Sequence, residues 1–313
     1  MQTKEIRFPK VAILLSSYNG EKFIAEQVDS LLAQEGVDIH IIVRDDGSTD
    51  NTVDIIKEFK AAHPGKIELI EGANVGWCKS FFLLVEYAAQ KTECEFYAFC
   101  DQDDIWLPDK LRVAVSALES MPDKTLPRLY CSNLFYYKDG INFGKIRKKK
   151  PIPTYKNCLV RNYATGCTIV FDNNLLKLIA AEPPGITVAH DYWAYMVAVL
   201  CGNVCIDNES YILYRQHENN QIGSKSGFYE IWKHRISDLR EFFNSHQREE
   251  QSRELMRLFS NHMYPNSIEA VSKLCNYRRS FFNQISLLCD NEYTLGYRSN
   301  DFWFKVRVLL RQV

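Results

Sequence analysis

The chain has 313 residues, of which 46% are hydrophobic and 25% charged, and its formal net charge is −1. This composition is that of a globular protein that can bury a sizeable core, and it excludes a disordered chain. The near-zero net charge gives no indication of a nucleic acid or of an acidic partner.

Ten cysteines are scattered along the chain without a C-x-x-C pair. Several of them, such as Cys100, Cys131 and Cys167, lie in apolar runs. This distribution predicts reduced, buried thiols and a cytoplasmic protein, because disulfide frameworks belong to oxidising compartments. The apolar runs are shorter than a transmembrane helix requires, and the run at 11–15 is too short for the apolar part of a signal peptide.

The N-terminal third alternates between short apolar runs and amphipathic segments. Strands are predicted at 11–15, 39–43, 67–70 and Phe96–Cys100, because each run is apolar and ends in polar residues. Helices are predicted where apolar residues recur at helical spacing, at 23–32, 53–59 and 81–88. Such regular alternation predicts a parallel α/β sheet with right-handed crossovers.

Polar loops follow three of these predicted strands and begin at Ser16, Asp45 and Asp101. In open parallel sheets the loops at the carboxyl ends of the strands converge on one crevice, where ligands bind. A nucleotide is the natural occupant of such a crevice. The sequence contains neither G-x-G-x-x-G after the first strand nor G-x-x-x-x-G-K-[ST], which disfavours a dinucleotide site and a P-loop.

Three carboxylates, those of Asp101, Asp103 and Asp104, follow the strand Phe96–Cys100 within four positions. Carboxylates are costly to bury unpaired, so they are expected where the strand leaves the sheet. Oxygen ligands in an Asp-x-Asp pattern suit a hard cation, Mg²⁺ or Mn²⁺, that bridges to substrate phosphates. The alternative is a polar turn that caps the next helix, and this pattern alone does not decide between the two.

Four motifs occur in order, at 11–19, 45–50 (Asp-Asp-Gly-Ser-Thr-Asp), 74–76 (Asn-Val-Gly) and 101–104 (Asp-Gln-Asp-Asp). Together they resemble family 2 glycosyltransferases of the GT-A fold. The resemblance implies an α/β fold, with a Rossmann-like, mostly parallel sheet flanked by helices and a C-terminal helical extension. We therefore predict a catalytic domain at 1–225, with nucleotide-sugar binding at about 9–125 and the acceptor side at 126–225, and a helical region at 226–313.

The resemblance also implies roles for individual residues on the nucleotide side. One carboxylate, that of Asp45 or Asp46, would accept a hydrogen bond from the imide of the base. Asp101 would contact ribose or metal, Asp103 would hold the metal, and Asp104 could do either. The remaining residues implied along the base, the ribose and the phosphates are Ser17, Tyr18, Asn19, Asn74, Gly76 and Lys79.

On the acceptor side, Asp191 opens a predicted apolar helix, where an aspartate is first of all an N-cap. The resemblance implies that it is the base, since an inverting transfer needs a carboxylate to take the proton of the attacking hydroxyl. His190 would orient this carboxylate or help to bind the acceptor. Tyr192 and Trp193 would stack on a sugar or belong to the core.

A loop that carries Arg215 and His217 follows the predicted strand at 211–213. Similar enzymes have Arg-x-His in a loop that closes over the donor diphosphate. His217 would ligate the divalent cation through its neutral imidazole, and Arg215 would neutralise the leaving diphosphate.

The C-terminal end at 302–311 mixes aromatic, aliphatic and basic residues in a predicted helix. Such a helix either lies in a membrane interface or docks on its own domain. Both interpretations remain open at the level of sequence.

Taken together, these features predict a metal-dependent, inverting glycosyltransferase that uses Mg²⁺ or Mn²⁺ and a nucleotide-diphosphate sugar. The Asp-Gln-Asp-Asp and His-Asp-Tyr-Trp motifs are most similar to bacterial rhamnosyltransferase-type members, which implies dTDP-L-rhamnose as the donor, with UDP-hexoses still open. The implied acceptor is a glycan of a growing, lipid-linked surface polysaccharide, without nucleic acid. The protein would be cytoplasmic, with a possible peripheral membrane contact. A nucleotidylyltransferase and a non-catalytic sugar-nucleotide or glycan-binding protein are the alternatives.

Overall fold

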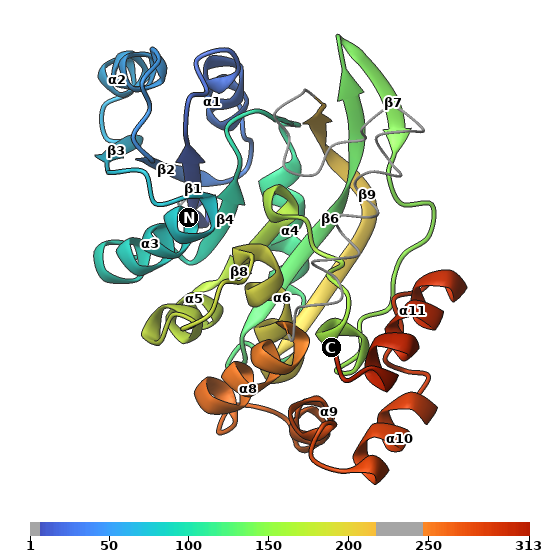
Figure 1. Ribbon diagram of the computed structural model, residues 1–313. Coiled ribbons are helices and arrows are strands. Elements are labelled where there is room, and N and C mark those ends of the chain that lie inside the picture. The colour runs from blue at the N-terminus through green and yellow to red at the C-terminus, as the bar shows by residue number, and fades with distance from the viewer. Residues whose placement is uncertain (1–6, 217–246) are drawn as a thin grey trace, which may run out of the picture.

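The computed structural model describes residues 7–216 and 247–313. Within these residues one nine-stranded sheet forms the centre of the molecule, in the order β3-β2-β1-β4-β8-β6-β9-β5, with β7 paired to β6 (Figure 1). The strands are β1 Lys10–Ser17, β2 Asp38–Asp45, β3 Ile67–Glu71, β4 Phe96–Cys100, β5 Ile105–Trp106, β6 Arg128–Lys138, β7 Ile141–Lys145, β8 Ile169–Asp172 and β9 Asn203–Arg215.

The first four long strands form the parallel part that the sequence predicts. Strand β1 pairs in parallel with β2 and with β4, and β2 pairs in parallel with β3. Beyond β4 the sheet becomes mixed, because β8 lies antiparallel to both β4 and β6. Strand β9 then continues parallel to β6. The short strand β8 therefore joins the parallel half of the sheet, which contains β1 to β4, to a second half that contains the longer strands β6 and β9.

Helices cover both faces of the sheet. Their bounds are α1 Ile24–Leu32, α2 Thr52–Ala62, α3 Trp77–Lys91, α4 Lys110–Glu119, α5 Asn173–Ala181, α6 His190–Cys201, α8 Gln247–Phe259, α9 Pro265–Asn276, α10 Phe281–Cys289 and α11 Arg298–Leu309. Single-turn 3₁₀ helices lie at Asn157–Leu159 and Gly166–Thr168. One buried cluster joins the sheet to α1, α2 and α4, and a second joins it to α3, α5, α6 and the C-terminal helices.

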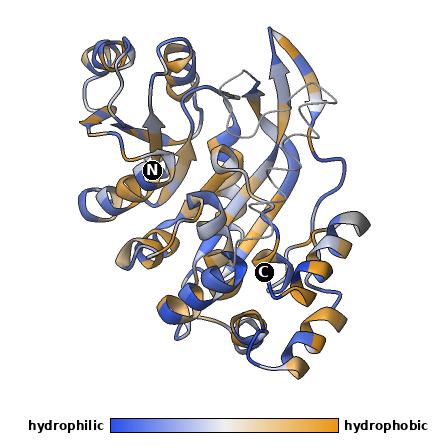
Figure 2. Cartoon of the chain, viewed as in Figure 1, coloured by the Kyte–Doolittle hydropathy of each residue, from blue (hydrophilic) through white to orange (hydrophobic). Residues whose placement is uncertain are grey.

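The alternation of side chains along β1 shows why the parallel strands are apolar throughout. Ala12 and Leu14 belong to the cluster on one face, whereas Val11, Ile13 and Leu15 belong to the cluster on the other. All five are completely buried. A strand covered on both faces has no solvent-facing position, so every residue must be apolar until the strand reaches its end. Figure 2 shows this hydrophobic interior between the more hydrophilic outer surfaces of the helices.

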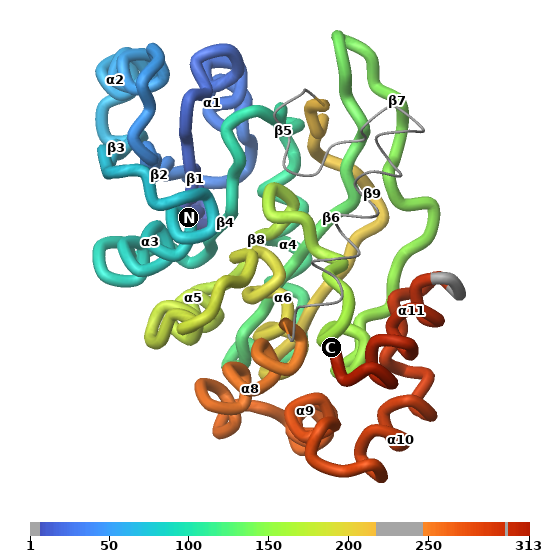
Figure 3. Tube along the Cα trace, viewed as in Figure 1, coloured from blue at the N-terminus to red at the C-terminus, as the bar shows by residue number. Residues whose placement is uncertain are grey.

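The described C-terminal helices, α8 to α11, lie beside α6 at the end of the molecule away from α1 and α2 (Figure 3). Their buried side chains, such as Leu255 and Phe259, join the same cluster as α6. The rings of Trp193 and Phe259 are 5.8 Å apart. The predicted helical character of 247–313 is therefore present, while the boundary at 225/226 lies outside the described residues and stays a prediction.

Within the described part of the chain, no helix combines the length and the apolar character that crossing a membrane would require.

A buried ion pair ties the start of β6 to the end of β8. Arg128 donates from Nε to Asp172 Oδ2 at 2.8 Å and from its backbone N to Asp172 Oδ1 at 3.1 Å. Asp172 is also the N-cap of α5, because Oδ1 accepts the backbone N–H of Leu175 at 3.0 Å. One buried carboxylate thus connects two strands and a helix at the junction of the two halves of the sheet.

We expect Asp172→Ala to lower the free energy of unfolding by about 3–5 kcal/mol, because it leaves the guanidinium of Arg128 buried without its partner. Chemical denaturation measures this loss. The control is Asp38→Ala, which removes a half-exposed ion pair to Lys66 and should cost about 1 kcal/mol or less. Equal losses in the two variants would contradict the role assigned to Asp172.

Candidate active site

The carboxyl ends of β1, β2 and β4 meet at one edge of the sheet. Ser17 on β1 lies directly opposite Asp45 on β2, and Leu15 lies opposite Cys100 on β4. The three polar loops predicted from the sequence therefore leave the sheet at the same level. The structure brings together the segments that contain Tyr18, Asp46 and Asp101.

Asp45 closes the turn that follows β2. Its Oδ1 accepts the backbone N–H groups of Gly47 at 3.1 Å and Ser48 at 2.8 Å. Its Oδ2 accepts the hydroxyls of Ser17 at 3.0 Å and Ser48 at 2.5 Å. These four bonds use the usual acceptor capacity of a carboxylate, and the side chain is buried. Asp45 therefore shapes the loop, a contribution that its sequence motif shares with many ordinary turns.

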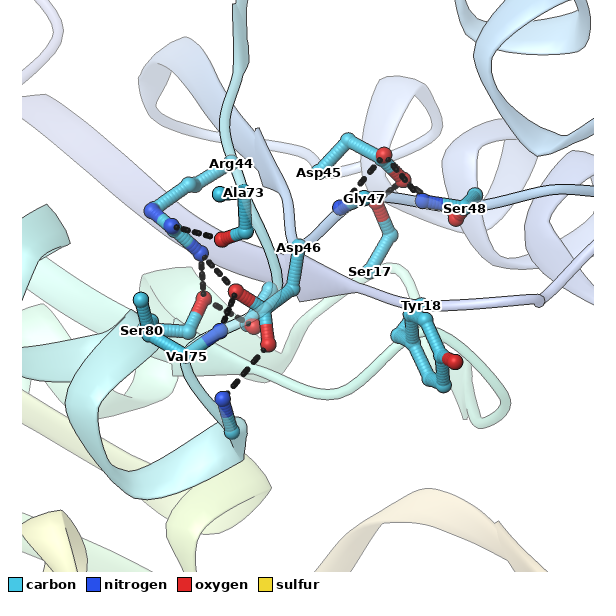
Figure 4. A network of polar contacts seen from close by, with 12 residues as sticks. Ser17, Tyr18, Arg44, Asp45, Asp46, Gly47, Ser48, Ala73, Val75 and Ser80 are labelled. Atoms are coloured by element: carbon cyan, nitrogen blue, oxygen red, sulfur yellow. Dashed lines mark hydrogen bonds and ion pairs between the residues drawn. The ribbon is translucent and has the colours of Figure 1, made fainter.

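Asp46 fastens the loop before α3 to the same edge (Figure 4). Its Oδ1 is 2.5 Å from Arg44 Nη1 and accepts the N–H of Val75 at 2.9 Å, while Oδ2 accepts the N–H of Gly76 at 2.9 Å. Arg44 also donates to Ser80 Oγ at 2.9 Å and to the carbonyl of Ala73 at 3.0 Å. Both charged groups are buried, so this network holds the 73–76 loop in one conformation.

Tyr18 and Asn19 occupy the loop after β1. The backbone of Tyr18 donates to Gln102 Oε1 at 2.8 Å and accepts from Gln102 Nε2 at 3.0 Å, so the side chain of Gln102 fixes this loop. The ring of Tyr18 is 46% exposed and points away from the Asp46 network (Figure 4). Asn19 has a positive φ of 48°, and its Oδ1 accepts the N–H of Thr49 at 2.8 Å. An exposed ring on a fixed backbone is suited to stack on a flat base.

The remaining predicted residues of this side lie in and after the 73–76 loop. Asn74, Gly76 and Lys79 are exposed. Gly76 precedes α3 with a φ of 84°, a conformation that favours glycine. The N–H of Gly76 is already bound by Asp46. The exposed side chains of Asn74 in the loop and of Lys79 in the first turn of α3 are therefore the groups available to a ligand.

The carboxylate loop after β4 gathers negative charge in partly buried surroundings. Ligand atoms of Asp101, Asp104 and Cys167 lie within 4.8 Å of one another. Burial, then the charges of Asp103 and Asp191, raise the pKa of Asp101 to about 7. Burial, then the charges of Asp103 and Asp101, raise the pKa of Asp104 well above its usual range. Negative charge is thus concentrated around Asp101 and Asp104.

These carboxylates fit a hard divalent cation. Oxygen ligands suit Mg²⁺ and Mn²⁺, and a cation would offset the repulsion that raises both pKa values. Cys167 does not fit as a ligand, because burial and the nearby charges of Asp104 and Asp101 raise its pKa well above the usual value and keep it a neutral thiol. Asp101 and Asp103 are partly exposed, whereas Asp104 is buried, so the first two are the more accessible ligands.

Arg215 ends β9 beside this loop. Its backbone N–H donates to Asp104 Oδ1 at 3.1 Å, and its Nε donates to the carbonyl of Asp103 at 2.9 Å. The guanidinium also pairs with Glu26 and lies 4.9 Å from the ring of Phe23. The structure therefore brings Arg215 to the carboxylate loop, whereas its predicted role at the leaving diphosphate stays a prediction. His217 lies outside the described residues.

Asp191 reaches the same region from the first turn of α6. Ala189, and not Asp191, occupies the N-cap position. Asp191 Oδ1 accepts the N–H of Tyr192 at 2.6 Å, and Oδ2 accepts from Asn162 Nδ2 at 3.2 Å. Burial raises the pKa of Asp191 to about 6 in spite of these hydrogen bonds. Its charge contributes to the raised pKa of Asp101, so the two carboxylates are near enough to interact electrostatically.

The neighbours of Asp191 on α6 belong to the core. His190 stacks on Phe81 with ring centroids 3.7 Å apart and meets Phe99 edge-on at 4.7 Å. Burial lowers the pKa of His190 to about 3, so its ring is neutral. Gly166 lies directly over this ring, since a Cβ at that position would be 3.1 Å from His190 Nε2. Tyr192 and Trp193 are buried too, so none of the three presents a face to a sugar.

Sequence reasoning missed several residues that build this site. Gln102, Arg44 and Glu26 hold the loops in place, and Asn162 binds the carboxylate of Asp191. Gln102 stands inside a recognised motif, which could have drawn attention to it. Asn162 has no local signal, because its partner is 29 residues away in the sequence.

A family model described as "Glycosyl transferase family 2" matches residues 12–177, more than half of the chain. The chain belongs to this family, which confirms the predicted resemblance, and it is a glycosyltransferase that acts on a nucleotide sugar. This class sets aside the nucleotidylyltransferase and the non-catalytic binding protein.

Two individual relatives match most of the chain. The chain is 33% identical over 224 residues to the dTDP-rhamnosyl transferase RfbG of Shigella flexneri, a match that covers 68% of this chain and 75% of RfbG. It is 28% identical over 225 residues to the UDP-Glc:alpha-D-GlcNAc-diphosphoundecaprenol beta-1,3-glucosyltransferase WfgD of Escherichia coli, covering 71% and 82%.

A solved structure supports the fold. S. aureus TarS 1–349, crystallised in complex with UDP-GlcNAc, superposes with a TM-score of 0.56 at 18% identity and covers 90% of this chain and 77% of that one. The predicted GT-A fold, with helices around the sheet and a C-terminal helical part, is thereby confirmed.

Proposed function

We propose that this protein is a metal-dependent, inverting glycosyltransferase that moves a sugar from dTDP-L-rhamnose, or from a UDP-hexose, to a lipid-linked glycan of a bacterial surface polysaccharide. The observation that carries the proposal is the position of Asp191. Its partly buried carboxylate, with a pKa raised to about 6, lies near enough to Asp101 for its charge to raise the pKa of that residue, and Asn162 holds it by a hydrogen bond. The relatives RfbG and WfgD support the two donor classes, and WfgD supports a lipid-diphosphate acceptor.

In this proposal, the residues at the edge of the sheet bind either the nucleotide or the cation. Tyr18 and Asn19 lie along the nucleotide, and Asp46 holds the loop whose exposed residues line the base and phosphates. Asp101 and Asp103 would hold the divalent cation, while Asp104 anchors the end of β9 by accepting the N–H of Arg215. When bound, the cation supplies positive charge that offsets the charge on the leaving diphosphate. Arg215 adds a second positive charge at the same edge.

Asp191 takes the proton of the acceptor hydroxyl as its oxygen attacks the anomeric carbon. The new bond joins that oxygen to the sugar, and the bond between the anomeric carbon and the diphosphate breaks, with its electron pair leaving on the diphosphate. Asn162 orients the carboxylate of Asp191 for this transfer. Attack from the side opposite the diphosphate inverts the anomeric carbon, as the family resemblance implies.

A donor screen tests the proposal directly. The purified protein with Mn²⁺ should hydrolyse dTDP-L-rhamnose or a UDP-hexose slowly and transfer it to an acceptor faster, and EDTA should abolish both activities. Asp191→Asn should bind the donor with unchanged affinity in calorimetry but transfer at least about 10²-fold more slowly, because it cannot accept the proton. Full transfer by Asp191→Asn would remove the assigned base, and no turnover or binding of any sugar nucleotide would overturn the proposal.

The pH dependence of kcat gives a second test. A carboxylate accepts a proton only when ionised, so with a pKa of about 6 Asp191 is active above pH 6. At saturating donor and Mn²⁺, kcat should therefore fall about tenfold for each pH unit below 6. Asp101, with its pKa near 7, should affect the KM for Mn²⁺ instead, since protonation removes a ligand. A kcat that stays level down to pH 5 would contradict Asp191 as the base.

The C-terminal helices support a peripheral membrane contact. Six large apolar side chains on α10 and α11 are 39–82% exposed: Phe281, Phe282, Ile285, Phe302, Trp303 and Leu309. Figure 2 shows hydrophobic residues along both helices. Arg278, Arg279 and Arg311 are exposed next to these helices, which favours an anionic lipid surface over an uncharged one. A membrane contact through this surface would bring the enzyme to a lipid-linked acceptor.

Vesicle flotation tests the contact. We expect binding to vesicles that contain phosphatidylglycerol and weaker binding to pure phosphatidylcholine. Phe282→Asp combined with Trp303→Asp should abolish it, because both charges would enter the apolar boundary. Phe143→Asp is the control, because Phe143 is a phenylalanine on β7 whose 65% exposure lies between those of Phe282 and Trp303. Unchanged flotation of the double variant would contradict the membrane contact, and a dimer that this variant dissociates would assign the surface to a second copy of the chain.

A further inference from the structure

A tyrosine from the C-terminal helical region stacks on the segment that holds Asp191. The guanidinium carbon of Arg161 lies 4.6 Å from the ring centroid of Tyr163 and 5.0 Å from that of Tyr297. Both distances are within the range of cation–π attraction. Tyr297 stands at the N-cap of α11, far along the chain from Arg161. The stack therefore joins the last part of the chain to the acceptor side of the catalytic half.

The loop that carries Tyr297 is built for this contact. Arg161 Nη1 donates to the carbonyl of Leu295, and Gly296 has a φ of 80°, which lets the backbone approach the guanidinium where a Cβ would collide with it. Asp301 holds the loop from the other side, since it accepts from Leu295 N at 2.6 Å and from Thr294 Oγ1 at 2.9 Å. These contacts fix the backbone directly before Tyr297.

The other end of the stack is fixed as firmly. Arg147 Nη1 donates to the carbonyl of Tyr163 at 2.6 Å. Asn162, which lies between Arg161 and Tyr163, is the residue that donates to Asp191. The stack and the partner of the predicted base thus share three consecutive residues. A hydroxyl that reaches the carboxylate of Asp191 is therefore close to Asn162, the central residue of this segment.

Tyr297 nevertheless stays 61% exposed. A large ring held in place while most of its surface faces solvent has already lost its conformational freedom, so it can bind a ligand at low entropic cost. The apolar face of a sugar ring matches the face of a tyrosine, and the phenol hydroxyl can bond to sugar hydroxyls. The exposed helices α10 and α11 flank the loop of Tyr297, so a lipid-linked saccharide would rise past it.

We propose that Tyr297, stacked on Arg161 and Tyr163, is an acceptor subsite that binds a sugar ring of a lipid-diphosphate-linked saccharide. Arg161 acts as a positioning residue that keeps the ring of Tyr297 in place. The inference rests on the proposed function and adds to it a specificity residue supplied by the C-terminal region. The residue reaches the site from outside the segment matched by the family model.

Transfer kinetics test the subsite. The probes are polyprenyl-diphosphate-linked GlcNAc, glucose, galactose and rhamnose, with dTDP-L-rhamnose and UDP-hexoses as donors. We expect Tyr297→Ala to raise the KM for the accepted probe roughly tenfold, while the KM for the donor stays within about twofold of wild type. Tyr297→Phe should retain most of the affinity because the stacking face remains. Arg161→Lys should shift the acceptor KM in the same direction as Tyr297→Ala, since an ammonium lacks the planar group.

The matched control is Tyr264→Ala, another exposed tyrosine in the C-terminal region. Tyr264 packs near Leu200 at the far end of α6 from Asp191, so its loss should leave the acceptor KM unchanged. An unchanged acceptor KM in Tyr297→Ala, or equal effects of the alanine and phenylalanine variants, would overturn the subsite. If wild type hydrolyses a donor but transfers to no lipid-linked probe, the acceptor class and the subsite fall together. If no donor is hydrolysed, the proposed function itself fails.

Discussion

Burial of the parallel strands on both faces is the constraint on which the rest of the structure depends. Side chains of β1 alternate between two cores and are fully buried from Val11 to Leu15, so this stretch contains no polar residue. The polar residues Ser16 and Ser17 follow where the strand ends. In β1, β2 and β4 these ends lie side by side, which concentrates the polar chemistry of three loops at one edge. The location of the site is thus a consequence of how the core is built.

The same concentration creates an electrostatic problem at that edge. Burial raises the pKa values of Asp101 and Asp104, and the nearby charges add to the effect, those of Asp103 and Asp191 at Asp101 and those of Asp103 and Asp101 at Asp104. Arg44 offsets only Asp46, with which it pairs directly. A cluster of this kind is costly in the free protein and favourable once a cation and a cationic side chain share it. Its cost to stability is therefore best explained by ligand binding, because no fold requires it.

Local sequence patterns allowed the first half of the fold to be predicted. The pairing of strands that are far apart in the sequence could not be predicted from such patterns. The strand Phe96–Cys100 was predicted with its observed bounds, because charged residues, Glu95 and Asp101, bound its apolar run on both sides. The antiparallel entry of β8 between β4 and β6 was not predicted, since nothing in its four residues specifies a partner. Period and spacing describe what one segment prefers, whereas strand order depends on segments far apart.

In the site, too, local motifs could be predicted from the sequence and packing could not. The loops with Asp46, Asp101 and Arg215 were predicted from motifs that are continuous in the sequence. That Asp45 is taken up by its own turn could not be predicted, because a turn residue and a ligand look alike in the sequence. His190 has the residue type of an acceptor ligand, yet aromatic rings from α3 and β4 enclose it. Only packing distinguishes these cases.

The C-terminal helices have a double role that follows from which of their faces are covered. Their inner side chains complete the core beneath α6, so they are part of the folded unit. Their outer side chains on α10 and α11 are apolar and remain exposed, which stabilises nothing in the isolated protein. Between these two faces the loop at 294–297 reaches back to Arg161 and, through Asn162, to the predicted base. A contact made at the outer face is therefore separated from the carboxylate of Asp191 by only a short chain of fixed residues, an arrangement that suits the proposed acceptor, which would arrive from a lipid surface.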